Sequence, residues 1–183
     1  MMTFELQPRL HNDLIRLEPL AAGDLEQLYA VAADPLIWEQ HPNPNRYQRA
    51  AFENYFKGAI ESGGAFRVID QATGETIGSS RFCSHNKVEK TIDIGYTFIA
   101  RSRWGGGYNR AMKTLMLDHA FGFVDRVIFQ VGINNKRSRA AMVKLGAVHI
   151  GDAEVSYYGE ASTHNVIYAI DRADWVGQQP AAG

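Results

Sequence analysis

Three consecutive glycines at positions 105–107 separate the most regular strand pattern of the chain from an amphipathic helical pattern. Residues 91–99 alternate in polarity, as the residues of a strand do. The expected apolar face consists of Ile92, Ile94, Tyr96 and Phe98. The helical stripe after the glycines consists of Met112, Leu115, Met116, His119 and Phe123. A strand that leads through a short turn into an amphipathic helix predicts a fold in which helices pack on a sheet.

The glycine turn is also a candidate phosphate site. Glycine has no side chain to keep a ligand from the backbone, and the following helix offers unpaired N–H groups with a partial positive charge. Arg101, Arg103 and Arg110 could add charge. The alternative is that the glycines form only a flexible connector. Other phosphate loops fit worse, because a P-loop ends in Gly-Lys-Ser/Thr and a dinucleotide fingerprint has a third glycine at the position of Arg110.

The remaining patterns predict an α+β (mixed α/β) domain. Strands are expected at residues 14–18, 65–70, 75–82, 91–99, 127–131, 148–157 and 165–170. Helices are expected at 24–33, 52–60, 108–123 and 135–145. The segment around Trp38, His41, Pro42 and Pro44 is expected to be a loop. We expect a single domain over residues 1–174 and a flexible tail over 175–183.

Charge and cysteine content exclude several classes of protein. The formal net charge is −1, which argues against non-specific binding to nucleic acid. The chain has one cysteine, so no intrachain disulfide can form. No signal-peptide stretch or membrane-spanning run is visible, and the histidines show no metal-ligand spacing. We therefore expect a soluble cytoplasmic protein without a metal.

The run Trp-Gly-Gly-Gly-Tyr-Asn-Arg-Ala-Met from Trp104 resembles the pyrophosphate-binding motif of the GNAT superfamily of N-acetyltransferases. It is most similar to the branch related to ribosomal-protein N-terminal (RimJ/RimL-like) acetyltransferases. Trp104 replaces the leading Gln or Arg of the family pattern, and Asn109 replaces its final Gly or Ala. The run Asn135-x-x-Ser138, followed by Lys-Leu-Gly-Ala from Lys144, resembles the family's fourth helix. The resemblance covers roughly residues 14–171.

The resemblance implies a central twisted mixed sheet of about seven strands with four helices. The family's fourth and fifth strands splay apart, and the pantetheine arm of coenzyme A (CoA) lies between them like an added strand. Asn135 would hydrogen-bond the pantetheine arm, and N–H groups of residues 105–110 would bind the pyrophosphate. The implied coenzyme site consists of Phe98, Ile99, Trp104, Gly105, Gly106, Gly107, Tyr108, Asn109, Arg110, Asn135 and Ser138.

The implied reaction is attack of a neutral amine on the thioester carbonyl of acetyl-CoA. Ser138 matches a position where related enzymes protonate the leaving thiolate; the alternative is that it only caps or packs its helix. Candidate bases are Asp93, Glu89 and His41. Asp93 is otherwise a solvated strand residue, and His41 a loop residue near solvent.

The resemblance thus implies an acetyl-CoA-dependent N-acetyltransferase that forms a ternary complex. Its acceptor would be a protein N-terminus or a small amine, and the protein a monomer or homodimer with no nucleic-acid or membrane partner. Two alternatives stay open: a CoA-binding sensor with a degenerate site, because Asn109 departs from the motif, and an acyltransferase with a longer acyl donor. The sequence identifies neither the acceptor nor the base.

Overall fold

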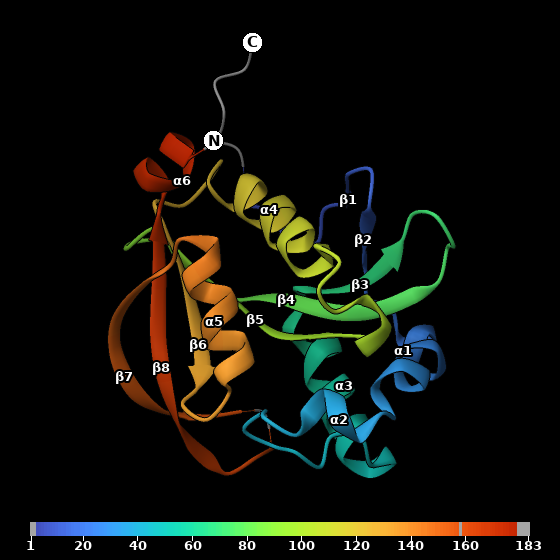
Figure 1. Cartoon of the computed structure of the whole chain (residues 1–183). Coiled ribbons are helices and arrows are strands. Elements are labelled where there is room, and N and C mark those ends of the chain that lie inside the picture. Colours follow the sequence, from blue (N-terminus) through green and yellow to red (C-terminus); the bar gives the residue numbers. More distant parts are fainter. Residues whose placement is uncertain (1–2, 158, 179–183) are drawn as a thin grey trace.

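The computed structural model describes residues 3–157 and 159–178 as one mixed sheet with helices on both faces (Figure 1). The strands are β1 (Leu10–His11), β2 (Ile15–Pro19), β3 (Ala65–Asp70), β4 (Thr76–Asn86), β5 (Thr91–Ile99), β6 (Arg126–Gly132), β7 (Val148–Ser156) and β8 (Ser162–Asp171). The helices are α1 (Leu25–Ala32), α2 (Pro35–Trp38), α3 (Arg49–Ser62), α4 (Tyr108–Ala120), α5 (Lys136–Leu145) and α6 (Arg172–Gln178). Among the described residues, no helix is long and apolar enough to cross a bilayer.

The strand order of the sheet is β1-β2-β3-β4-β5-β6-β8-β7. Neighbouring strands are antiparallel except β5 and β6, which are parallel. Because a parallel pair needs a crossover, α4 connects β5 to β6. The short turn before α4 therefore lies at the carboxyl end of β5, in the middle of the sheet (Figure 1).

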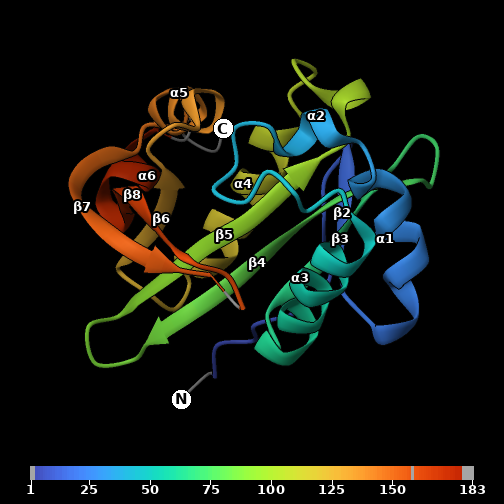
Figure 2. The same ribbon diagram turned by 90° about the horizontal axis from the view of Figure 1, so that it is seen from below.

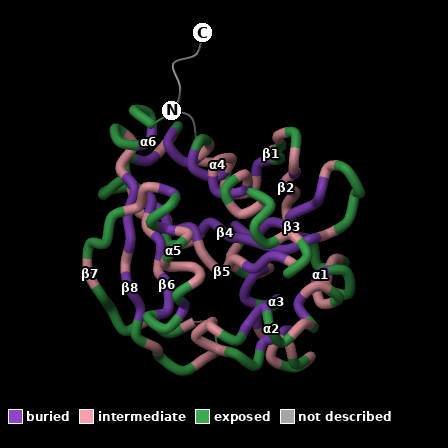
Figure 3. Tube along the Cα trace, in the orientation of Figure 1, coloured by how far each residue is buried: buried purple, intermediate pink, exposed green. Residues whose placement is uncertain are grey.

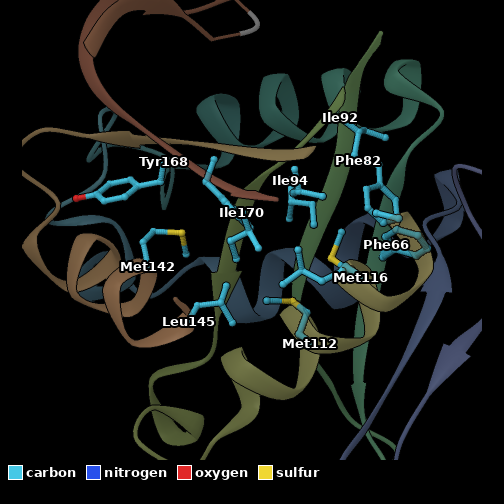
Figure 4. Packing of buried hydrophobic residues seen from close by; sticks show 14 of the residues in the cluster. Phe66, Phe82, Ile92, Ile94, Met112, Met116, Met142, Leu145, Tyr168 and Ile170 are labelled. Atoms are coloured by element: carbon cyan, nitrogen blue, oxygen red, sulfur yellow. The ribbon is translucent and has the colours of Figure 1, made fainter. Parts of the chain in front are cut away.

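Two apolar clusters hold the helices on opposite faces of the sheet. One contains Met112 and Met116 of α4 with Met142 and Leu145 of α5, packed on Ile94 and other strand residues (Figure 4). The second joins α1, α2 and α3 through residues such as Trp38 and Phe52. Figure 3 shows burial concentrated on the inner strands, whereas β7 is largely exposed at its edge.

Every strand and helix predicted from the sequence is present. Residues 65–70 and 91–99 form β3 and β5 with the predicted bounds, and the other elements agree within a few residues. Glycine ends α3 and α5, because Gly63 and Gly146 adopt left-handed conformations with φ of 64° and 90°. Fold class and element order are thus confirmed.

Three elements were not predicted. The sheet has eight strands rather than about seven, because the two-residue β1 joins its edge. Part of the expected loop forms α2, where Asp34 Oδ1 accepts the Leu36 N–H at 3.0 Å, as an N-cap does. The expected tail starts at Trp175, but α6 extends to Gln178 and the Trp175 ring is buried. Residues 179–183 of that tail lie outside the described residues.

The prediction of one continuous apolar face on β5 is wrong beyond Gly95. Ile94 packs under α4, whereas Phe98 packs into the opposite cluster with α2 and α3. The pairing Ser79↔Phe98 is followed by Arg81↔Gly95, so β5 carries one extra residue there. That residue makes a bulge in which Tyr96 has a φ of 52°, and the Tyr55 hydroxyl donates to the Tyr96 carbonyl oxygen at 2.5 Å. The bulge exchanges the two faces of the strand.

Gly78 on β4 lies so close to β5 that no larger residue fits. A Cβ at this position would lie 2.1 Å from the Phe98 carbonyl oxygen, which is a fixed backbone atom. The close approach occurs next to the bulge, where the two strands are strongly distorted. Gly78 therefore fixes the position of the carboxyl end of β5.

We predict that Gly78→Ala destabilises the protein by roughly 1–3 kcal/mol, because the new methyl group must displace backbone. The matched control is Gly23→Ala, since a Cβ at Gly23 meets nothing within 4 Å. Chemical denaturation of both variants checks the prediction. Equal midpoints for the two variants would contradict it.

Candidate active site

A gap opens between β5 and β6 at the centre of the sheet (Figure 1). The two strands pair at only three positions, and the last is Asp93↔Ile128. Beyond it the strands diverge and leave a cavity of about 490 Å³, which is lined by both strands and by α4 and α5. Unpaired strand backbone beside a cavity can pair with an extended ligand. The splayed strands implied by the resemblance are therefore present as β5 and β6.

The glycine turn borders the open end of this gap, as predicted. Gly105 and Gly107 adopt left-handed conformations with φ of 74° and 81°. Gly107 caps α4 without a side-chain hydrogen bond, and the Ala111 N–H is the donor to its carbonyl. The N–H groups of the first turn of α4 therefore lack intrahelical partners. Asn109, at the last position of the pattern, lies in this turn and lines the cavity.

The cavity is strongly basic. Its lining includes Arg46, Arg103, Arg110, Lys113, Arg137 and Lys144. Among the described residues, no aspartate or glutamate lines it. A low-dielectric cleft lined by one sign of charge attracts ligands of the opposite sign. The cationic lining and the free N–H groups at the start of α4 together suit a long ligand that carries phosphate groups.

The arginines around the turn differ in what they contact. Arg101 forms an ion pair with Asp34 and does not line the cavity. Arg103 Nε lies 2.9 Å from Asp70 Oδ2, and the Tyr108 hydroxyl donates to the same carboxylate oxygen at 3.0 Å. These contacts anchor the turn to β3. Arg110 donates to the Lys144 carbonyl at 3.0 Å and so links α4 to α5.

Trp104 and Arg137 meet across the mouth of the gap. The Arg137 guanidinium carbon lies 3.9 Å from the centre of the Trp104 ring, a cation–π contact. Trp104 Nε1 also donates to the Ile99 carbonyl at 3.0 Å. The Arg137 N–H donates to Gln40 Oε1 at 3.1 Å, so the segment after α2 joins the same assembly.

The backbone of Ile99, rather than that of Phe98, faces the gap. The Ala100 N–H donates to the Ile77 carbonyl at 2.8 Å on the β4 side. Because hydrogen-bonding residues alternate along an antiparallel ladder, Phe98 pairs with Ser79 and Ile99 points the other way. The Trp104 contact to the Ile99 carbonyl agrees with this. Both expected strand residues line the cavity, and Ile99 is the one whose backbone groups point into the gap.

Asn135 and Ser138 both line the cavity, on the opposite side from the glycine turn. Asn135 is the N-cap of α5, and its Oδ1 accepts the Ser138 N–H at 3.1 Å. The amide of Asn135 is buried, and Ser138 is half-buried in the first turn of the helix. The sequence prediction that these residues share one site is consistent with this arrangement.

His41 lies in the segment after α2 and lines the cavity. The ring is half-buried and packs edge-on against Trp38, with ring centres 4.9 Å apart. Burial and the positive charges of Arg46 and Arg137 lower the pKa of His41 to about 3. The imidazole is therefore uncharged at neutral pH and is a weak base.

Asp93 is buried but does not line the cavity. It lies at the closed end of the gap, where Gln130 Nε2 donates to its Oδ2 at 2.6 Å. Burial raises the pKa of Asp93 to about 6, and the Gln130 hydrogen bond opposes this rise. Asp93 positions Gln130, which does line the cavity.

Among the cavity residues that sequence reasoning missed are Arg46, Lys113 and Tyr157. Arg46 Nη2 pairs with Glu160 Oε2 at 2.7 Å, and its guanidinium lies 5.2 Å from the Tyr157 ring centre. These contacts join segments more than 100 positions apart, which no local pattern indicates. The burial of Lys113 could have been predicted from the sequence, because Met116, Leu117 and Ala120 follow it at helical spacing on a buried face.

Comparisons with known proteins agree with this geometry. The family model described as the acetyltransferase (GNAT) domain matches residues 15–148. A search of curated proteins found no match. A proposed acetyltransferase from T. thermophilus is 25% identical, with a TM-score of 0.77 over 97% of this chain and 95% of its own.

Two further solved structures share the fold at lower identity. RimJ of Mycobacterium smegmatis, in complex with CoA-disulfide, is 20% identical with a TM-score of 0.68, covering 90% of this chain and 86% of its own. Spermidine N-acetyltransferase from Vibrio cholerae, in complex with CoA and spermine, is 18% identical with a TM-score of 0.66, covering 90% and 99%.

Asp93 makes a testable contribution to the pH dependence of stability. Its pKa is higher in the folded than in the unfolded chain, so the folded state binds the proton more tightly. The contribution of Asp93 to the free energy of unfolding therefore falls as pH rises from about 4 to about 6, and little of it is left above about pH 6. We predict that Asp93→Asn removes this fall and is more stable than the parent at pH 7 by roughly 2–3 kcal/mol. Denaturation at pH 4 and pH 7 measures it, with the exposed Asp13→Asn as control. A parallel pH dependence in parent and Asp93→Asn would contradict the prediction.

We predict that Gly107→Val lowers affinity for CoA at least about tenfold. Valine disfavours the left-handed conformation of Gly107, so the turn must change shape and its N–H groups no longer converge. The control is Gly74→Val, because Gly74 has a similar φ of 72° but lies away from the cavity. Calorimetric titration with CoA should show weakened binding in the first variant alone. Unchanged affinity in Gly107→Val would remove the phosphate site from this turn.

Proposed function

Because the chain belongs to the GNAT acetyltransferase domain family, we propose that it transfers the acetyl group of acetyl-CoA to a primary amine in a ternary complex. One observation carries the proposal: the gap between β5 and β6 opens beside a glycine turn whose N–H groups are unpaired. A diphosphate at the turn would leave the pantetheine arm along the free edge of β5. The thioester would then lie toward the closed end of the gap.

The basic lining supports CoA as the ligand. Arg110, Arg137 and Lys144 lie around the open end, where they would meet the phosphate groups of the coenzyme. The Ile99 backbone would pair with the pantetheine arm, and Asn135 would contact the same arm from α5. Asn109 does not block this arrangement, because its backbone N–H belongs to the same first turn.

The reaction needs little acid–base assistance. The amine nitrogen attacks the thioester carbonyl, a tetrahedral oxyanion forms, the C–S bond breaks, and the proton lost by the amine passes to the thiolate. A backbone N–H of β5 that faces the gap nearer its closed end would stabilise the oxyanion. Ser138 is the proposed donor to the leaving thiolate. Because thiols have a pKa near 8.5, loss of Ser138 should slow the reaction modestly.

The charge of the cavity favours one class of acceptor. No carboxylate of the described residues lines it, so a polycationic amine would meet arginines rather than counter-charges. His41 is a weak base, and Asp93 does not reach the cavity. An acceptor with an amine of low pKa fits both facts, because α-amino groups, with a pKa of about 7.7–8.0, are partly neutral near pH 7.5. We propose a protein N-terminus or an amino acid as acceptor, rather than a polyamine.

Binding and turnover test this proposal separately. Acetyl-CoA at about 100 times Kd should stabilise the protein by about 2.7 kcal/mol and raise Tm by roughly 5–10 °C. Thiol release with an N-terminal peptide, an amino acid and spermine should be fastest with an α-amine. Absence of a thermal shift would refute the proposal. A shift without thiol release for any amine would instead indicate a CoA-binding sensor.

Ser138→Ala should lower kcat by about tenfold or less and leave the Tm shift intact. The matched control is Ser84→Ala, which lies outside the cavity and should not change kcat. A full loss of activity in Ser138→Ala would contradict the modest role proposed for its hydroxyl.

A further inference from the structure

Lys113 is buried inside the gap that the proposed function assigns to the acyl thioester. Its side chain is 3% exposed and lines the cavity. Nζ donates to Thr97 Oγ1 of β5 at 2.6 Å and to Ser80 Oγ of β4 at 3.4 Å. Nζ also lies 5.8 Å from the ring centre of Phe129 on β6. The amine therefore lies between the two strands that border the gap.

Lys113 lies farther from the open end of the gap than the glycine turn does. Lys113 follows Gly107 by six positions, which is about 9 Å along a helix. Thr97 likewise precedes Ile99 on β5, toward the closed end of the gap. A coenzyme with its phosphates at the turn and its arm along β5 would carry its acyl group toward Lys113.

No carboxylate of the described residues forms an ion pair with Lys113. Its two acceptors are hydroxyl groups, which themselves hydrogen-bond at 2.8 Å. Two of its three donors are thus used when the amine is charged, and one is left for the cavity. Burial lowers the pKa of Lys113 to about 7, as expected for an ammonium without a counter-charge.

A structural role alone accounts poorly for this residue. Met112, Met116 and Leu117 fill the surrounding face of α4, and an apolar side chain at position 113 would avoid the cost of burying a charge. The hydroxyls of Thr97 and Ser80 already satisfy each other. A lysine is useful here if something in the cavity supplies the missing negative charge.

We propose that Lys113 binds the terminal carboxylate of a short dicarboxylic acyl group, so that the cavity accepts malonyl- or succinyl-type CoA esters in preference to neutral acyl groups of the same size. The inference rests on the proposed function, because it assumes that the thioester lies in this gap. The remaining ammonium donor would bond one carboxylate oxygen, and the ion pair would replace the absent counter-charge.

The transfer step would remain the same. The amine nitrogen forms a bond to the thioester carbon, the C–S bond breaks, CoA leaves as the thiol with the proton from the amine, and the product amide keeps its free carboxylate. Lys113 is neither nucleophile nor base in this step. It selects the acyl group by charge.

The test compares malonyl-CoA with isovaleryl-CoA, whose acyl group has the same heavy-atom skeleton but no charge. Calorimetric titration of the parent should give about tenfold tighter binding of malonyl-CoA, as expected for a charge-assisted hydrogen bond in a buried site. Lys113→Met should reduce that ratio to one or below, while acetyl-CoA still binds. Lys113→Gln serves as a second variant, since its amide can still donate to Thr97.

Lys144→Met is the matched control, because Lys144 lines the cavity at the α5 end. It should weaken all three esters equally and leave the malonyl preference unchanged. Equal affinity of the parent for malonyl- and isovaleryl-CoA would overturn the inference, and so would a preference that survives in both Lys113 variants. If acetyl-CoA also fails to bind the parent, the proposed function fails too; if acetyl-CoA binds, only this inference is lost.

Discussion

The structure depends on a parallel ladder that stops after three residue pairs. Asp93↔Ile128 is the last pair, and beyond it each strand keeps its other neighbour while losing the one across the gap. Backbone groups deprived of a partner are costly unless they face a cavity that a ligand or water can fill. Here the cavity lies along the free edge of β5, and the turn and two helices close around it. The cavity is thus an interruption in the sheet rather than an addition to its surface.

The bulge at Tyr96 makes the two sides of this interruption chemically different. Before the bulge, Ile94 packs in the core under α4. After it, Phe98, also at an even-numbered position, packs on the opposite face with α2 and α3. Thr97 consequently faces α4 and meets Lys113. Aromatic residues therefore gather on one side, and a polar group with a lysine on the other. One inserted residue thus gives the two sides of the gap different side chains.

Sequence periodicity predicted the order and bounds of most elements, because burial on one face leaves a regular pattern in β5, α4 and α5. Gly105, Gly107, Asn135 and Ser138 line one cavity, and their role as a coenzyme site stays a prediction. The bulge was not predicted, since alternation in residues 91–99 continues unbroken through it. Lys113 was overlooked because lysine is ordinarily read as a surface residue. Arg46 and Glu160 meet only through tertiary packing, which local patterns do not encode.

The Arg46–Glu160 ion pair limits which sequence changes the two segments that it joins can accept. Two hydrogen bonds of 2.8 and 2.7 Å join Arg46, in the segment after α2, to Glu160, between β7 and β8. Figure 2 shows the ends of β7 and β8 on the side of the molecule where α2 and α3 lie. Both side chains are nearly excluded from solvent. Replacing either segment with one that lacks its member of the pair would leave one buried charge unpaired, a loss that typically costs several kcal/mol. A change that removes Arg46 or Glu160 therefore calls for a compensating change in the other segment, despite their separation along the chain.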